Sequence, residues 1–359
     1  MPILASALWT SHVKTRDNSR ADRPHKRPRL STGLCELDTA LDGGLDYGHT
    51  TCVTAEADSD AQDLTLHLVA AHLLSHEGAS ATVIYSTLSF DVVKLHTHLA
   101  ASCRNEVEGQ DAAAEAVAML DRVKIIKVFD FVGLTEGVAE IRADFEGERD
   151  APAGPPPPPQ KIVIPKGTIG DSEDEGEDEM LDDAPSADDR PNLPKMPPPS
   201  GPNDPRHLLV IDNIAHLASP LLKNNRSQGQ ALLTSFMRSL SHLTRTYDLC
   251  TVVLNNAISY RQSSREETPS IFSSCTLRPA LGKAFASLLD LHLLVHRVPK
   301  TAGDARMIFG GGGGGGQRTD RAPEMVSVVE VLQDRAGGRV GRWAAVVGNE
   351  TGGLRDAIT

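Results

Sequence analysis

The sequence predicts an α/β fold with a mainly parallel central sheet, an antiparallel C-terminal edge and helices on both faces. Over residues 31–148, short Val- and Ile-rich runs alternate with helical patterns, as in parallel sheets that are covered on both sides. The alternation resumes over residues 206–359. There the last apolar runs follow one another without intervening helices, which is typical of antiparallel strands.

The individual elements follow from the apolar periodicity. The first half contains two amphipathic segments and three short apolar runs, which predict helices over 61–76 and 91–101 and strands over 50–54, 81–86 and 123–129. The second half predicts one long helix over 227–246 and strands over 207–212, 251–254, 288–296, 326–332 and 343–347. Together these elements make up one domain.

Residues 1–30 are polar and carry seven Lys or Arg against two Asp, a net charge of +5. They predict a disordered basic tail. A short basic cluster in an exposed tail is suited to nuclear import, and a tail that is merely solvated is the alternative. The cluster consists of Arg23, Lys26, Arg27 and Arg29.

Residues 149–205 are rich in proline and carry five basic against 13 acidic residues, a net charge of −8. Such a segment cannot bury enough apolar surface to offset its ordering entropy, so we expect a disordered insertion. Within it, Ile162, Val163 and Ile164, followed by Ser172 and acidic residues, resemble a motif that adds a strand to a small ubiquitin-like modifier. The alternative is a few apolar residues in a linker.

Charge and composition exclude several classes of protein. The chain has a net charge of −12, so residues outside the tail and the insertion carry −9, which does not suit a broadly basic nucleic-acid surface. No run approaches the ~20 apolar residues that cross a membrane, so we expect no membrane contact. Five scattered cysteines without a CxxC pair predict neither disulfides nor a metal site. The glycine run 310–316 lacks the strand-to-helix context of a phosphate loop and predicts a flexible hairpin.

Four segments in a fixed order carry a family resemblance: Ser31–Asp38 with the glycines after it, the apolar strand ending in Asp212, Val252–Asn256, and Pro279–Phe285. Together they resemble the RecA-like recombinases, and in particular the eukaryotic, fungal-type DNA-recombination paralogues. The resemblance covers most of residues 31–353. It implies a RecA-like core divided by the insertion.

The resemblance also places the family's phosphate loop, GxxxxGKT, on residues 55–62. Ala55 stands at the first glycine, Asp60 at the second, Ala61 at the lysine and Gln62 at the hydroxyl. A carboxylate about 4 Å from a phosphate costs roughly 4 kcal/mol in a partly shielded site. Because this degenerate loop opposes phosphate binding, we expect ATP and Mg²⁺ to bind weakly or only at a subunit interface.

The same resemblance implies that two further positions lack the family's catalytic side chains. Thr87 stands where the family has the glutamate that activates water, and threonine cannot act as that base. Ala257 stands where the family has a phosphate-sensing glutamine. Asp212 is the one hydrolytic residue that is kept, and we interpret it as a remnant. The resemblance therefore predicts no catalytic residues, no metal and no resident cofactor.

Two stretches resemble the family's DNA-facing loops, one between Asp212 and the long helix and one between Asn256 and Pro279. Basic side chains with an aromatic residue suit single-stranded DNA through phosphate neutralisation and base stacking, and exposed polar loops are the alternative. The candidate contacts are Lys223, Arg226, Arg261, Arg265, Phe272 and Arg278.

The function implied by the resemblance is that of a nuclear, non-catalytic or weakly nucleotide-binding subunit. It would form a hetero-oligomer with other recombinase-family subunits and assist recombinase assembly on single-stranded DNA during repair by homologous recombination. One alternative is a RecA-fold scaffold of the Elongator type, which serves transfer-RNA modification. Another is a working ATPase that receives its lysine from elsewhere.

Overall fold

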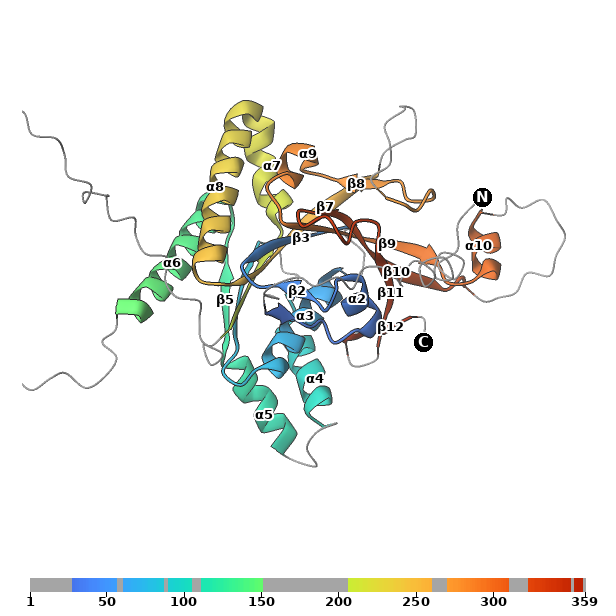
Figure 1. Ribbon diagram of the computed structural model, residues 1–359, viewed down its shortest axis with the longest axis horizontal. Coiled ribbons are helices and arrows are strands. Elements are labelled where there is room, and N and C mark those ends of the chain that lie inside the picture. Colours follow the sequence, from blue (N-terminus) through green and yellow to red (C-terminus); the bar gives the residue numbers. More distant parts are fainter. Residues whose placement is uncertain are drawn as a thin grey trace, which may run out of the picture. The chain divides into compact units, whose positions relative to one another are not determined.

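A computed structural model of the chain provides the structure (Figure 1). The chain divides into two compact units, residues 1–145 with 205–359, and residues 146–204. Of the second unit only the end of one helix is described, so the architecture below belongs to the first. The described residues are 28–56, 61–86, 90–104, 111–150, 206–259, 270–309, 322–349 and 352–357. The glycine run 310–316 and residues 162–164, predicted to bind a small ubiquitin-like modifier, lie outside them.

The central sheet has ten strands, ordered β12-β11-β10-β9-β3-β7-β6-β4-β5, with β8 paired to β7 outside this path. Six neighbouring strands are parallel: β3 (His49–Ala55), β4 (Ser80–Tyr85), β5 (Val123–Lys127), β6 (His207–Asp212), β7 (Cys250–Ser259) and β9 (Leu291–Pro299). The antiparallel edge continues with β10 (Met325–Asp334), β11 (Trp343–Gly348) and β12 (Leu354–Asp356), and β8 (Leu277–Pro279) is antiparallel to β7. A separate ribbon pairs β1 (Arg29–Leu30) with β2 (Leu45–Asp46).

Helices cover both faces of the sheet because its strands send alternate apolar side chains to opposite sides. Val83 and Val252 belong to one core, whereas their neighbours Ile84 and Val253 belong to the other. The first core includes α2 (Cys35–Ala40), α3 (Ala61–Ser75), α4 (Val92–Cys103) and α5 (Asp111–Leu120). The second includes α6 (Phe131–Asp150), α7 (Ile214–Asn224), α8 (Arg226–Thr246) and α9 (Gly282–Ala286), while α10 (Ala302–Phe309) follows β9. The predicted fold class is confirmed.

The described helices are all too short or too polar to cross a membrane. The predicted strands are present, but β7 continues to Ser259, beyond its predicted end at 254, because it pairs with β8.

The structure also corrects the assignment of Arg29. This residue lies in β1, with Nε 2.6 Å from Asp46 Oδ1, so it belongs to the folded domain and not to an exposed import cluster.

A buried ionic network joins the start of the domain to its antiparallel edge. Arg339 is 3% exposed; its Nη1 lies 3.0 Å from Asp46 Oδ2 and its Nε lies 3.0 Å from Asp334 Oδ2. Burial alone would raise the pKa of Asp334, but Arg339 and the backbone N–H groups of Ala336 and Gly338 lower it to about 2. The network therefore fastens β2 to the turn between β10 and β11.

We expect Arg339→Ala to lower the free energy of unfolding by about 3–5 kcal/mol, because it leaves buried carboxylates without their shared cation. Arg342→Ala is the matched control. Its Nη1 lies 2.5 Å from Asp42 Oδ1 in an exposed pair, so the loss should stay below about 1 kcal/mol. Urea denaturation measures both, and equal losses would contradict this account of the network.

Four histidines are neutral parts of the interior. Burial lowers the pKa of His72, His98, His207 and His292 to about 4. His207 Nδ1 lies 2.8 Å from Ser80 Oγ and its Nε2 lies 3.0 Å from Thr82 Oγ1, so the neutral ring is held on both sides. Protonation requires these rings to carry charge in the core.

Stability should therefore fall in acid. Between pH 6.5 and about 4 the unfolded chain binds more protons than the folded one, so this contribution is complete above pH 6.5 and is lost as the pH falls. Each such histidine adds at most roughly 1.4 kcal/mol per pH unit. We expect His207→Asn to flatten the pH dependence of unfolding and His216→Asn, on the exposed surface, to leave it unchanged. A dependence that is equally steep in all three proteins would refute this origin.

Candidate functional site

The candidate site lies at the carboxyl ends of the central parallel strands, where open α/β sheets bind their ligands. β3 ends at Ala55 and α3 begins at Ala61, and both side chains are buried. Gln62 is exposed in the first turn of α3, and Asp60 lies outside the described residues. A buried methyl group thus occupies the position where the resemblance requires a lysine.

The first turn of α3 carries a negative charge that sequence reasoning missed. Asp63 lies in this turn, and its Oδ1 is 2.5 Å from Nζ of Lys94 in α4. A carboxylate here stabilises the positive end of the helix dipole, which a phosphate would otherwise occupy. The nearby lysine is engaged by Asp63 and is not presented to a ligand.

Asp212 ends β6 and is buried, and the residue after it connects neighbouring strands. Asn213 Oδ1 accepts a hydrogen bond from Ala215 N at 3.0 Å, which caps α7. Asn213 Nδ2 donates to Asn256 Oδ1 at 2.5 Å. The carboxyl ends of β6 and β7 are therefore tied to each other by side-chain amides. Thr87, the predicted position of the lost base, lies outside the described residues.

A buried polar cluster lies beneath these strand ends. Thr54 Oγ1 accepts from Asn255 Nδ2 at 3.0 Å and lies 2.7 Å from His292 Nε2. Burial lowers the pKa of His292 to about 4, so the cluster is neutral. Ala257 lies beyond it, paired with Pro279 in the β7–β8 ribbon. Its methyl group has no hydrogen-bonding capacity toward a phosphate.

The described positions of this site differ from the set that the resemblance requires. They contribute the methyl groups of Ala55 and Ala61, side-chain amides, the buried carboxylate of Asp212 and a lysine that is paired with Asp63. The described residues contain no cluster of three or more His, Cys, Asp or Glu able to hold a metal ion. The arrangement is suited to connecting strand ends, and the roles of Asp60 and Thr87 stay predictions.

The first predicted DNA-facing loop is helical. α7 and α8 are separated only by Asn225, whose side chain accepts from Gln228 N at 3.1 Å and caps α8. The helices cross closely at Gly229, where a Cβ would lie 2.9 Å from the backbone of Leu221. Lys223 in the last turn of α7 and Arg226 at the start of α8 are exposed, but on helices. This corrects the expectation of a loop.

The second predicted loop is anchored at its C-terminal end. Glu330 of β10 is 1% exposed and accepts hydrogen bonds from Ser270 Oγ at 2.5 Å and Ile271 N at 2.7 Å. Phe272 is fully buried, and its ring centroid lies 5.4 Å from that of Trp343. Stacking of Phe272 on a base is therefore excluded in this structure, a correction to its predicted role.

The remaining candidates of that loop are placed only in part. Arg278 is exposed in β8, opposite Ile258 of β7. Arg261 and Arg265 lie outside the described residues. Sequence reasoning missed the contact between Glu330 and the second predicted loop. The sequence around an acidic residue in an apolar strand does not indicate that it binds the backbone of Ile271, 59 residues earlier.

No family model matches the chain. Among curated proteins, it is similar to "DNA repair protein RAD51 homolog 4" of Bos taurus, with 21% identity over 266 residues, which is 74% of this chain. The match spans 60% of the length of that relative. This similarity and the RecA-like sheet support a relationship to the RecA-like recombinases.

We expect the purified full chain to release no phosphate from Mg-ATP, and Asp212→Ala to leave the background unchanged. The lost lysine and the added carboxylates should weaken nucleotide binding by about a thousandfold or more. Phosphate release and fluorescent-nucleotide binding measure both quantities. Turnover that Asp212→Ala abolishes would instead identify a working ATPase that obtains its lysine elsewhere.

Proposed function

We propose that this chain is a non-catalytic subunit of a recombinase-family assembly that acts in DNA repair by homologous recombination. In this proposal it forms a hetero-oligomer with other recombinase-family subunits and assists assembly of the recombinase on single-stranded DNA. Its similarity to a DNA repair protein supports a role in recombination and repair.

The observation that carries the proposal is the combination of a preserved sheet with a replaced phosphate site. β3, β6 and β7 are paired in parallel, yet the position expected for the lysine is the buried Ala61. A protein that conserves the shape of an ATPase core without its phosphate-binding side chain can still present the surfaces of that core to neighbouring subunits. It therefore acts as a structural member of the assembly, and Mg-ATP binds weakly or at a subunit interface.

Contact with single-stranded DNA is a secondary part of the proposal. Arg261, Arg265, Arg278 and Lys223 can neutralise phosphates, whereas the buried Phe272 removes the stacking contribution. We therefore expect weak, salt-sensitive contact that gains strength from neighbouring subunits.

Nuclear import through Arg23, Lys26 and Arg27 is also proposed, since Arg29 is engaged with Asp46. Binding of a small ubiquitin-like modifier through Ile162, Val163 and Ile164 is a further proposal that rests on sequence alone. Each involves a segment outside the described residues and is separate from the role of the folded domain.

Copurification from native cells, before and after DNA damage, tests the proposed function. We expect mass spectrometry to recover recombinase-family subunits with the tagged full chain at comparable stoichiometry. The Asp212→Ala variant should recover the same subunits, because assembly does not depend on hydrolysis. Recovery of transfer-RNA-modification subunits, as an Elongator-type scaffold would give, or of no partner, would contradict the proposal.

A further inference from the structure

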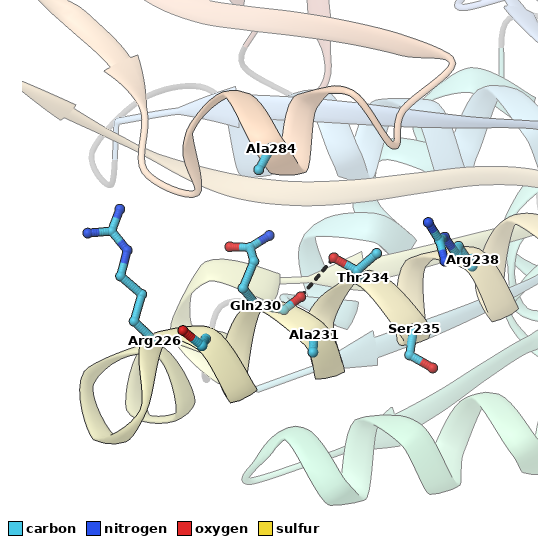
Figure 2. A pocket seen from close by; sticks show the side chains of 8 residues that line it. Arg226, Gln230, Ala231, Thr234, Ser235, Arg238 and Ala284 are labelled. Carbon is cyan, nitrogen blue, oxygen red and sulfur yellow. Dashed lines mark hydrogen bonds between the residues drawn. The ribbon is translucent and has the colours of Figure 1, made fainter.

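A groove of about 770 Å³ lies between α8 and α9 (Figure 2). Arg226, Gln230, Thr234 and Arg238 follow one another at four-residue spacing along one face of α8, and Ala284 of α9 lies across from them. Figure 2 shows the two arginines at opposite ends of this row. Twelve residues of helix place them about 18 Å apart.

The groove is cationic in an acidic protein. The sequence has no Asp or Glu from Ile214 to Thr246 or from Ser270 to Leu289, although the whole chain carries −12. Arg226 and Arg238 are both exposed. Within the described part of the chain, neither guanidinium has an ion-pair partner. Two arginines without an ion pair, on one face of a helix, create an attractive site for an extended anion.

We propose that the α8–α9 groove binds an acidic segment of a partner protein. The inference rests on the proposed function, because it identifies a surface through which the chain engages a neighbouring subunit. Each guanidinium presents a planar fork that matches a carboxylate in bidentate fashion. Arg226 and Arg238 therefore hold two acidic side chains of one segment, one at each end of the groove.

The floor of the groove is suited to a polypeptide backbone. The half-buried Gln230 carries an amide that can both donate to and accept from a peptide group. The Thr234 hydroxyl donates to Gln230 O at 2.7 Å and is thereby occupied. Ala231 and Ala284 are small and exposed, so they leave room for a chain to approach.

Nucleic acid fits the same surface less well. Single strands are held in large part by bases stacked on aromatic side chains, and the residues that line the groove include no aromatic. Phe272, the aromatic candidate of the second stretch, is fully buried.

Fluorescence anisotropy with the full chain tests the proposal. The probe is a labelled peptide of alternating Glu and Ser, and a labelled oligothymidine of equal charge is the comparison. We expect the peptide to bind more tightly than the oligothymidine. The double variant Arg226→Glu with Arg238→Glu should weaken the affinity for the peptide by at least about tenfold. Arg306→Glu, a single charge reversal on the exposed surface of α10, is the control for each single reversal, Arg226→Glu or Arg238→Glu, and should leave binding unchanged.

A second double variant, Arg226→Gln with Arg238→Gln, removes both charges without reversing them. It keeps the test valid if the Glu variant unfolds, and it should also weaken peptide binding. Peptide binding that survives both pairs, or equal loss with Arg306→Glu, would overturn the proposal. Tighter binding of the oligothymidine, lost with the arginines, would overturn it in favour of a nucleic-acid site. Copurification separates this proposal from the proposed function. If a variant that no longer binds the peptide still recovers recombinase-family subunits, only the role of the groove is refuted. If the wild-type chain recovers no such subunits, the proposed function itself is refuted.

Discussion

Burial of β3 on both faces is the constraint on which the rest of the structure depends. β3 lies between β7 and β9, and its successive side chains enter different cores: Cys52 joins the core of α6–α9, whereas Val53 joins that of α2–α5. Its parallel pairing aligns Ala55 with Asn256 of β7 and with Val295 of β9. That register sets where the parallel strands end. It therefore places Ala55, Asp212 and Asn256 together at the carboxyl ends of the central strands.

The sequence predicted the strands well because their apolar runs carry their own signal. β6 was predicted over 207–212 and occupies the same residues, and the antiparallel edge followed from consecutive strands without helices. Contacts between distant residues had no such signal. The anchoring of Ser270 by Glu330 and the binding of Asp46 by Arg339 are long-range pairings, which hydrophobic periodicity does not encode. Phe272 was misjudged for the same reason, since it packs against the distant Trp343.

The proposed function describes a fold that keeps its shape while its phosphate chemistry is replaced, and two contacts at the candidate site support it. At the start of α3, Asp63 and Lys94 neutralise each other, and at the end of β6 an amide pair links Asn213 to Asn256. These contacts stabilise the strand ends from within. We therefore expect the domain to order the carboxyl ends of its strands without a nucleotide, and its outer surfaces, including the α8–α9 groove, to serve assembly.

The most direct test of this account is native mass spectrometry of the intact assembly, purified in Mg²⁺ and a non-hydrolysable ATP analogue. The measurement counts the nucleotides that remain bound and identifies which subunit carries them on dissociation. The account predicts that the other recombinase-family subunits carry nucleotide and that this chain is released without one. Release of this chain with a bound nucleotide and Mg²⁺ would contradict the claim that it contributes structure and not ATP chemistry.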